Sequence, residues 1–209
     1  MKLKFIYVFL VFLTLFGFSQ CSADELDEFA DEMEVKEIYD PFNGYNRAMT
    51  SFNDGLYEHV MKPVANGYKT VLHVEIRASI SKFFHNLYFP MRVTNNILQG
   101  KFENSLEESE RFVINSTIGI LGLFDPANSK FNIEKHNEDF GQTLGFYRVG
   151  GGAHVVLPFF GPSNVRDALS MIPDSFLNPI DYAARQDEIT VFEYIAIKTV
   201  EKINCASQN

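Results

Sequence analysis

Five arginines lie within or beside the apolar stretches of this 209-residue chain, namely Arg47, Arg92, Arg111, Arg148 and Arg166. Arginine suits phosphate because its planar guanidinium donates two parallel hydrogen bonds to one anion. In a chain with a formal net charge of −9, such cations are candidates for binding a phosphate group. The alternative is that each arginine forms a surface ion pair or lays its aliphatic stem along apolar surface.

The residue patterns of common catalytic sites are absent from the sequence. There is no G-x-S-x-G serine elbow and no GK[ST] after a glycine cluster, and the five histidines lack metal-ligand spacing. His136 with Glu138 and Asp139 comes nearest to a metal or acid–base cluster, but a polar turn between apolar segments is the better interpretation. The sequence therefore predicts that the protein is not an enzyme and that it has no catalytic residue, metal or cofactor.

The run Phe112–Phe124 has apolar residues on every side except at the polar patch Asn115–Thr117. Because a surface helix would confine its apolar residues to one stripe, this pattern predicts a helix buried in protein or in lipid. Thirteen residues at ~1.5 Å each extend about 20 Å, which is short of the ~30 Å core of a bilayer. Gly119 and Gly122 would let another backbone approach closely.

A second segment combines dense glycine with large apolar residues. Gly141, Gly145 and Gly150–Gly152 alternate with aromatic and aliphatic side chains. Glycine permits positive φ and close contacts, and a flexible linker would instead be polar. We expect a tightly folded apolar loop structure here, followed by a helix that Ser163 caps.

Composition restricts the partners of the chain. The acidic balance argues against nucleic acid and against electrostatic adhesion to anionic lipid. Attachment to a membrane would then be hydrophobic or covalent. With 21 Phe and 9 Tyr, the chain can both bury a core and coat a membrane-facing surface.

Residues 1–20 are typical of an export signal, with Lys2 and Lys4 ahead of the apolar run Phe5–Phe18. Two processing routes fit the following residues. A lipobox would end at Cys21, which would be acylated, although Gln20 is larger than the usual preceding residue. The ordinary signal peptidase could instead cleave after Ala23, and only an unacylated Cys21 could pair with the other cysteine of the chain.

Residues 21–39 are predicted to form an acidic tether. A weak amphipathic helix is the alternative, because Leu26, Phe29, Ala30 and Met33 recur at helical spacing.

Three blocks of sequence closely resemble a known family. They are DPFNGYNRAMTSFND from Asp40, INSTIGILGLFDPA from Ile114, and HNEDFGQTLGFYRVGGGAHVVLPFFGPSNVRD from His136. These blocks look like the MlaA (VacJ) family of outer-membrane lipoproteins in Gram-negative bacteria, and the match covers about residues 40–174. Related chains usually continue beyond the position of Asn209 into a further helical segment.

The resemblance implies a phospholipid channel on the periplasmic face of the outer membrane. It would remove mislocalised phospholipid from the outer leaflet, sit in the inner leaflet, contact a trimeric porin and pass lipid to a periplasmic lipid-binding carrier. The alternative is a structural lipoprotein that braces a porin without conducting lipid. Moving a phospholipid requires apolar contact for its acyl chains and a polar, preferably cationic, route for its phosphodiester.

Candidate residues follow from that requirement. The headgroup candidates are Arg47, Arg111, Arg148 and Arg166. The candidates for lining the lipid passage or facing the membrane are Phe112, Ile118, Gly119, Leu121, Gly122, Leu123, Phe124, Gly150, Gly151 and Gly152.

The elements that must position these residues are mostly helical. Expected features are a helix starting at Asp40–Pro41, a kink at Pro63, helices over 76–87 and 90–99 with Gly100 as C-cap, a capping box at Ser105–Glu108, a loop bracketed by Pro173 and Pro179, and a last helix over 191–203. Only 154–157 has strand character. We predict an all-α, compact, ring-like domain over residues 40–209, with glycine-rich loops and little or no sheet.

Overall fold

The computed structural model describes residues 40–208, so the signal-peptide and tether predictions lie outside the described residues. In chain order the elements are α2 (Asn43–Leu56), the π-helix η1 (Tyr57–Met61), α3 (Lys62–Val71), α4 (Val74–Leu87), α5 (Phe89–Leu98), α6 (Phe102–Thr117), α7 (Pro126–Phe131), α8 (Phe140–Phe146), β1 (His154–Leu157), β2 (Gly161–Asn164), α9 (Val165–Leu177), α10 (Pro179–Arg185) and α11 (Val191–Ala206).

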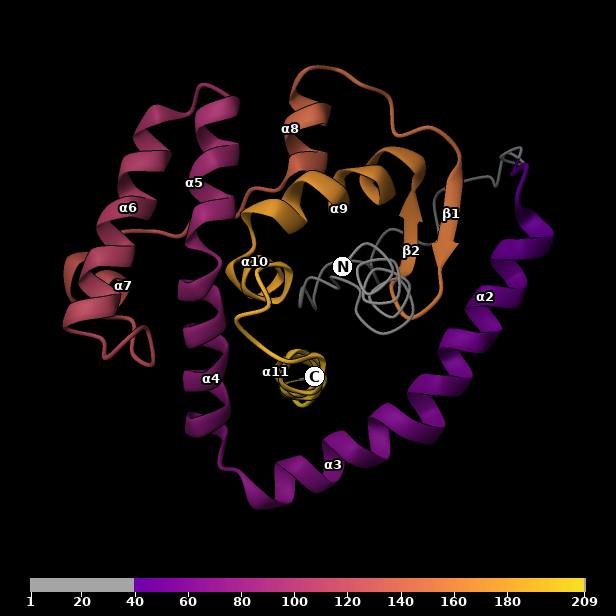
Figure 1. Cartoon of the computed structure of the whole chain (residues 1–209), viewed down its shortest axis with the longest axis horizontal. Helices are drawn as coiled ribbons and strands as arrows, with labels where there is room; N and C mark the ends of the chain where they lie inside the picture. The colour runs from indigo at the N-terminus through magenta and orange to yellow at the C-terminus, as the bar shows by residue number, and fades with distance from the viewer. Residues whose placement is uncertain (1–39, 209) are drawn as a thin grey trace, which may run out of the picture.

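The helices are arranged as a ring (Figure 1). A curved arm of α2, η1 and α3 forms one side, α4 and α5 form the opposite side, and α8 with α9 lies between them at the top of the view. The short helix α10 and the last helix α11 lie inside this outline, while α6 and α7 lie outside α4 and α5. The predicted all-α class is confirmed, since the described sheet is one two-stranded hairpin.

The bend in the long arm lies where proline predicts it. Pro63 has no backbone N–H to donate to the preceding turn, and the five-residue π-helix η1 comes immediately before it. Bends in long helices occur at proline and at π-turns of this kind. Helix α2 begins at Asn43, later than predicted, although the Asp40 carboxylate accepts a hydrogen bond from Phe42 N at 2.9 Å just ahead of it.

Several helix boundaries agree with the sequence patterns and others do not. Gly100 ends the α5 region with φ of 73°, as a C-cap glycine should. The capping box predicted from Ser105 is wrong, because α6 already begins at Phe102 directly after that glycine turn. The loop predicted between the two prolines is also wrong, since Pro173 lies inside α9 and only Pro179 begins a helix.

The hairpin contains one strand that was predicted and one that was not. His154–Leu157 forms β1, and Gly161–Asn164 pairs with it in antiparallel register, with His154 opposite Asn164. Glycine, proline and asparagine are depleted in strands, so the formation of β2 depends on its pairing with β1. Ser163 therefore lies in a strand, and the N-cap of α9 is Asn164, whose side chain accepts from Asp167 N.

The described residues bury polar groups and expose apolar ones to an unusual degree. Seven hydrophobic side chains are buried, against thirty large hydrophobic side chains that are exposed. The largest fully buried side chains are Glu108, Asn95, Asn96, Asn178, Asn204 and Ser207. Hydrogen-bond networks therefore hold the ring together. Transfer of its exposed apolar surface from water to an apolar environment would be favourable.

Candidate functional site

The apolar run that dominated the sequence is not one buried helix. Helix α6 ends at Thr117, and residues 118–124 form a tight turn, called the apolar turn below. Three consecutive residues adopt left-handed conformations: Ile120 (φ 53°), Leu121 (φ 56°) and Gly122 (φ 92°). Gly122 N donates to Asn115 O at 2.8 Å, which folds the turn back on the end of the helix. The prediction of a continuous buried helix is therefore wrong.

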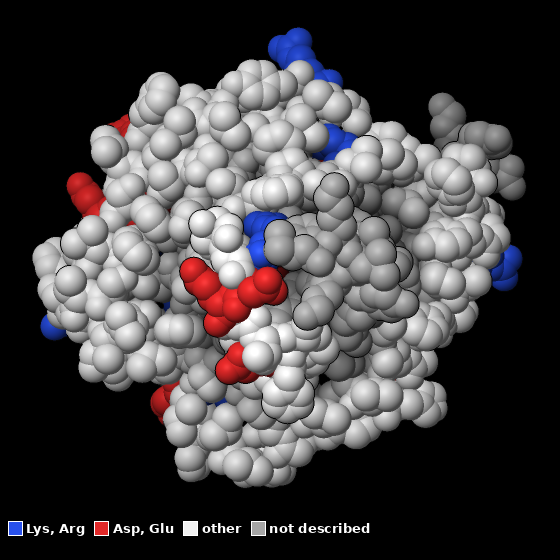
Figure 2. Space-filling view, in the orientation of Figure 1, with Lys and Arg blue, Asp and Glu red and all other residues white. Residues whose placement is uncertain are grey.

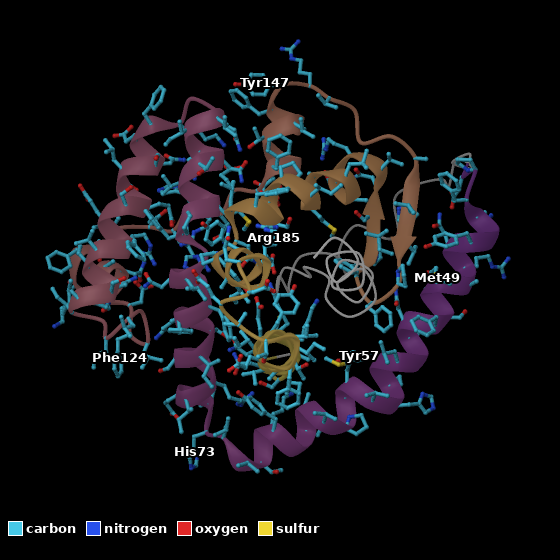
Figure 3. All side chains as sticks on the ribbon, in the orientation of Figure 1. Met49, Tyr57, His73, Phe124, Tyr147 and Arg185 are labelled. Atoms are coloured by element: carbon cyan, nitrogen blue, oxygen red, sulfur yellow. The ribbon has the colours of Figure 1, made fainter. Side chains whose placement is uncertain are left out.

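The turn directs its large side chains outward. Ile118, Ile120, Leu121 and Phe124 are each more than half exposed, with Leu121 at 65%. Phe124 lies at the outer edge of the ring in Figure 3. Of the remaining candidates of this run, Gly119 and Gly122 are buried, and Phe112 and Leu123 are half-buried. The Phe112 ring in α6 stacks on the Phe89 ring at a centroid distance of 4.2 Å. Exposed apolar side chains gathered on one turn are typical of a surface that contacts a membrane or another protein.

Both glycines of the turn permit a close contact, as the sequence predicts. A Cβ on Gly119 would lie 2.5 Å from Asn115 O, within the same turn. A Cβ on Gly122 would lie 2.4 Å from the Cβ of Asn86 in α4. The neighbour of Gly122 is thus a side chain of another helix rather than a backbone.

The turn is strained and is held from α4. A β-branched residue such as Ile120 rarely adopts positive φ, and each such residue costs on the order of 1–3 kcal/mol. Asn86 Nδ2 donates to Ser116 Oγ at 2.9 Å and to Leu121 O at 3.4 Å, which fixes the turn. Strain retained in order to display apolar side chains favours a binding role for the turn.

The glycine-rich segment is more regular than expected. Its first part is the helix α8, which packs on α9: a Cβ on Gly141 would lie 2.7 Å from Asp167 Oδ1, and one on Gly145 would lie 3.0 Å from an Arg166 nitrogen. The stretch Gly150–Gly152 leads into β1, with positive φ at Gly152. Phe146, Tyr147 and Val149 beside it are exposed, and Tyr147 lies at the rim of the ring in Figure 3.

Two of the four headgroup candidates serve the fold. Arg111 is buried and contacts Asp125 Oδ2 at 2.9 Å and Ile133 O. Burial works to raise the pKa of Asp125, but hydrogen bonds from Arg111 and Asn115 outweigh it and hold that pKa below its usual value. Arg166 binds Asp167 Oδ1 at 2.7 Å and Val149 O at 3.1 Å.

The other two headgroup candidates, Arg47 and Arg148, are exposed, and neither makes an ion pair with any residue between 40 and 208. These two remain able to contact an external anion.

Arg92, the fifth arginine, belongs to a buried network that joins α5 to α6. Its Nε contacts Glu108 Oε2 at 2.8 Å, and the other Glu108 oxygen accepts from His136 N at 2.6 Å. Glu138, also in the segment between α7 and α8, contacts Lys101 Nζ at 2.6 Å. The segment around His136 is therefore a polar connection that clamps two helices, and it is an irregular segment rather than the turn expected from the sequence.

Sequence reasoning missed a polar cluster inside the ring. Tyr194 OH donates to Asp181 Oδ1 at 2.9 Å, Tyr88 OH donates to Glu201 Oε2 at 2.6 Å, and Lys198 Nζ lies 3.5 Å from Asp181. The spacing of Tyr194, Lys198 and Glu201 by four and three residues is a polar stripe on α11 that could have revealed it. These groups stabilise the contacts of α4, α10 and α11.

Charge is sparse over the face of the ring drawn in Figure 2. Most of the described atoms there are uncharged, and acidic side chains gather near the middle, beside the position at which Figure 3 labels Arg185. In the part of the chain from 40 to 208, every helix is too short or too polar to cross a bilayer. The prediction of acylation at Cys21 lies outside the described residues.

Fold and surface together define a class of protein: a helical ring that displays apolar side chains without a described membrane-spanning helix. The chain belongs to the MlaA lipoprotein family, whose family model matches residues 38–209.

Named relatives and one solved structure are similar to this chain. An uncharacterised protein of Rickettsia prowazekii (strain Madrid E) is 38% identical, over 72% of this chain and 60% of its own length. The intermembrane phospholipid transport system lipoprotein MlaA of Escherichia coli (strain K12) is 35% identical, over 66% of this chain and 56% of its own. This chain thus spans less than two thirds of the length of either relative. A solved structure from work on the structural basis for maintenance of bacterial outer membrane lipid asymmetry superposes with a TM-score of 0.65 at 29% identity, covering 82% of this chain and 84% of that chain.

Proposed function

We propose that this protein is a non-enzymatic phospholipid passage on the periplasmic side of a Gram-negative outer membrane. It accepts mislocalised phospholipid from the outer leaflet and passes it to a periplasmic carrier, which maintains lipid asymmetry. The observation that carries the proposal is the apolar turn, whose large side chains are exposed on the outside of a ring that buries polar side chains. A ring seated in one leaflet explains both features, because its rim then faces acyl chains.

Names of relatives support the same activity. The Escherichia coli relative is described as a lipoprotein of an intermembrane phospholipid transport system, and the superposed structure concerns outer-membrane lipid asymmetry. In this proposal a trimeric porin and a periplasmic lipid-binding carrier are the protein partners, as the family resemblance implies.

Individual residues have proposed roles in this passage. Arg47 and Arg148 guide the phosphodiester, because they are the exposed, unpaired members of the headgroup candidates within the described chain. Outside the passage, Ile118, Leu121 and Phe124 contact the acyl chains of the surrounding leaflet, and Gly150–Gly152 keep the backbone beside β1 compact. Arg111 and Arg166 act indirectly, since both hold structural contacts.

A test of the function is deletion of the gene followed by labelling of outer-leaflet phospholipid with a reagent specific for accessible headgroups. The proposal predicts a rise in labelled phospholipid, which the wild-type gene reverses. An unchanged level would argue strongly against a role in asymmetry.

The same assay separates lipid passage from porin bracing. Polar substitutions at Gly150–Gly152 should raise outer-leaflet phospholipid if this segment serves the passage. If those variants lose the porin complex while asymmetry is kept, the protein is a structural brace instead.

A further inference from the structure

A pocket of about 460 Å³ lies behind the apolar turn, between α4 and α7. Its lining residues are Lys82, Ile118, Phe124, Asp125, Pro126, Asn128, Ser129 and Lys130. Phe124 marks its position on the outside of the ring (Figure 3), away from the interior that the proposed passage would use. Any ligand of this pocket is therefore distinct from a lipid in transit.

The pocket carries a net positive charge. Lys82 of α4 and Lys130 of α7 are both exposed, and neither forms an ion pair with another described side chain. The carboxylate of Asp125 does not neutralise them, because its Oδ2 accepts from Arg111 at 2.9 Å and its Oδ1 accepts from Asn115 Nδ2 at 2.9 Å. With Asp125 balanced by Arg111, the two lysine charges remain for an anion.

Part of the pocket lining is apolar. Ile118 and Phe124 are 57% and 54% exposed, so the branched side chain of Ile118 and the ring of Phe124 are open to a ligand in the pocket. Asn128 in α7 is exposed beside them and makes no side-chain hydrogen bond among the described residues, which leaves its amide to donate to a phosphate oxygen. A free phosphate ion would use the lysines and this amide but would leave the apolar part of the lining in water.

We propose that the pocket between α4 and α7 binds a glycerophospholipid as a resident ligand, with Lys82 and Lys130 contacting its phosphate and with Ile118 and Phe124 contacting the start of its acyl chains. Lysine binds phosphate as a point charge and requires no fixed geometry. The bound lipid anchors the apolar turn at the height of the headgroups. The net acidity of the chain does not oppose this, because charges beyond about 10 Å are largely screened at physiological salt.

The first test measures lysine protection in the wild-type mature chain. Acetylation rates of Lys82 and Lys130, followed by mass spectrometry, should fall when phosphatidylglycerol vesicles are added and should stay unchanged with vesicles of an uncharged, phosphate-free galactolipid. Lys69 in α3 and Lys135 before α8 are the internal controls, since neither lines the pocket. Equal protection of these controls, or no protection at all, would overturn the proposal.

The second test uses matched charge removal. Lys82→Gln/Lys130→Gln should bind phosphatidylglycerol vesicles roughly twentyfold more weakly than wild type, because each lysine that is held close to the anionic headgroups contributes a factor of about five. Lys69→Gln/Lys135→Gln loses the same charge and should bind as wild type does. Equal weakening of both variants would mean general electrostatics and would overturn the site. Circular dichroism of both variants confirms that each is folded.

A third arm distinguishes the two sources of phosphate. Inorganic phosphate should protect the two pocket lysines far less than lipid does, and Phe124→Ser should reduce protection by vesicles. If inorganic phosphate protects fully and Phe124→Ser has no effect, the ligand is free phosphate and the lipid assignment is wrong. The outcome is independent of the proposed passage, because no lipid transfer is measured.

Discussion

Asn46 in α2 pairs with Val156 in β1 much as one strand pairs with another. The Asn46 side chain accepts from Val156 N at 2.8 Å and donates to His154 O at 3.1 Å. Two helical turns later Asn53 repeats the arrangement, accepting from Phe159 N at 2.7 Å and donating to Leu157 O at 2.9 Å. Two side-chain amides thus dock the arm of the ring on the hairpin.

Loss of one of these amides should loosen the hairpin. In Asn46→Ala the buried N–H of Val156 loses its partner, which should lower the free energy of unfolding by roughly 2 kcal/mol. Hydrogen exchange should accelerate over residues 154–159. Asn43→Ala, an exposed change one turn earlier on the same helix, should leave exchange unchanged. If hydrogen exchange over residues 154–159 in Asn46→Ala is as slow as in wild type, the contact contributes little to stability.

A methyl group at Gly122 should displace the apolar turn. It would lie 2.4 Å from the Asn86 Cβ, at a backbone φ of 92° that disfavours any side chain. Gly122→Ala should therefore cost about 2 kcal/mol or more in unfolding free energy. Gly44→Ala has no atom within 4 Å of the new methyl and should be neutral or stabilising. Thermal melts of the two variants give the comparison, and equal midpoints would contradict it.

Removal of the Glu108 carboxylate should destabilise the ring strongly. Glu108→Ala leaves the buried guanidinium of Arg92 without its partner at 2.8 Å, a loss of roughly 3–5 kcal/mol. The exposed Glu110 on the same helix serves as control, since Glu110→Ala should change stability by about 0.5 kcal/mol or less. Urea titrations of both variants test this, and a small effect at Glu108 would mean that the ion pair is dispensable.

His85 should make the fold sensitive to mild acid. Burial and the neighbouring Arg92 guanidinium lower the pKa of His85 from 6.5 to about 4. The unfolded chain therefore takes up this proton first, so the stability that neutral His85 contributes is complete above pH 6.5 and is lost as the pH falls toward 4. Between these limits, thermal midpoints of wild type should fall more steeply than those of His85→Gln, which does not titrate. Parallel curves would contradict the account.

Much of the helical framework was predictable because it depends on local patterns. Apolar spacing and proline positions located α4, α5, α11 and the bend at Pro63, and β-branched residues located β1. The ring-like arrangement was expected from the family resemblance and agrees with Figure 1.

The remaining features depend on contacts distant in sequence. The run 118–124 reads as helix because its residues are apolar, yet Asn86 of α4 and two glycines bend it into a left-handed turn. Strand β2 depends on pairing with β1, and the partners of Arg111 and Arg166 could not be read from charge spacing alone. Composition indicated arginines near apolar surface but did not distinguish exposed from structural ones.

Flotation of the mature protein with phospholipid vesicles tests most directly whether the apolar turn seats the ring in a leaflet. Wild type should float with the vesicles, and Ile120→Ser/Leu121→Ser should float at least about tenfold less, because each of the two exposed side chains loses roughly 1–2 kcal/mol of apolar transfer energy. Ile120→Val/Leu121→Met keeps the turn apolar and should float as wild type does. If wild type stays in the soluble fraction, or if the serine variant floats equally well, the apolar turn does not seat the ring in a leaflet.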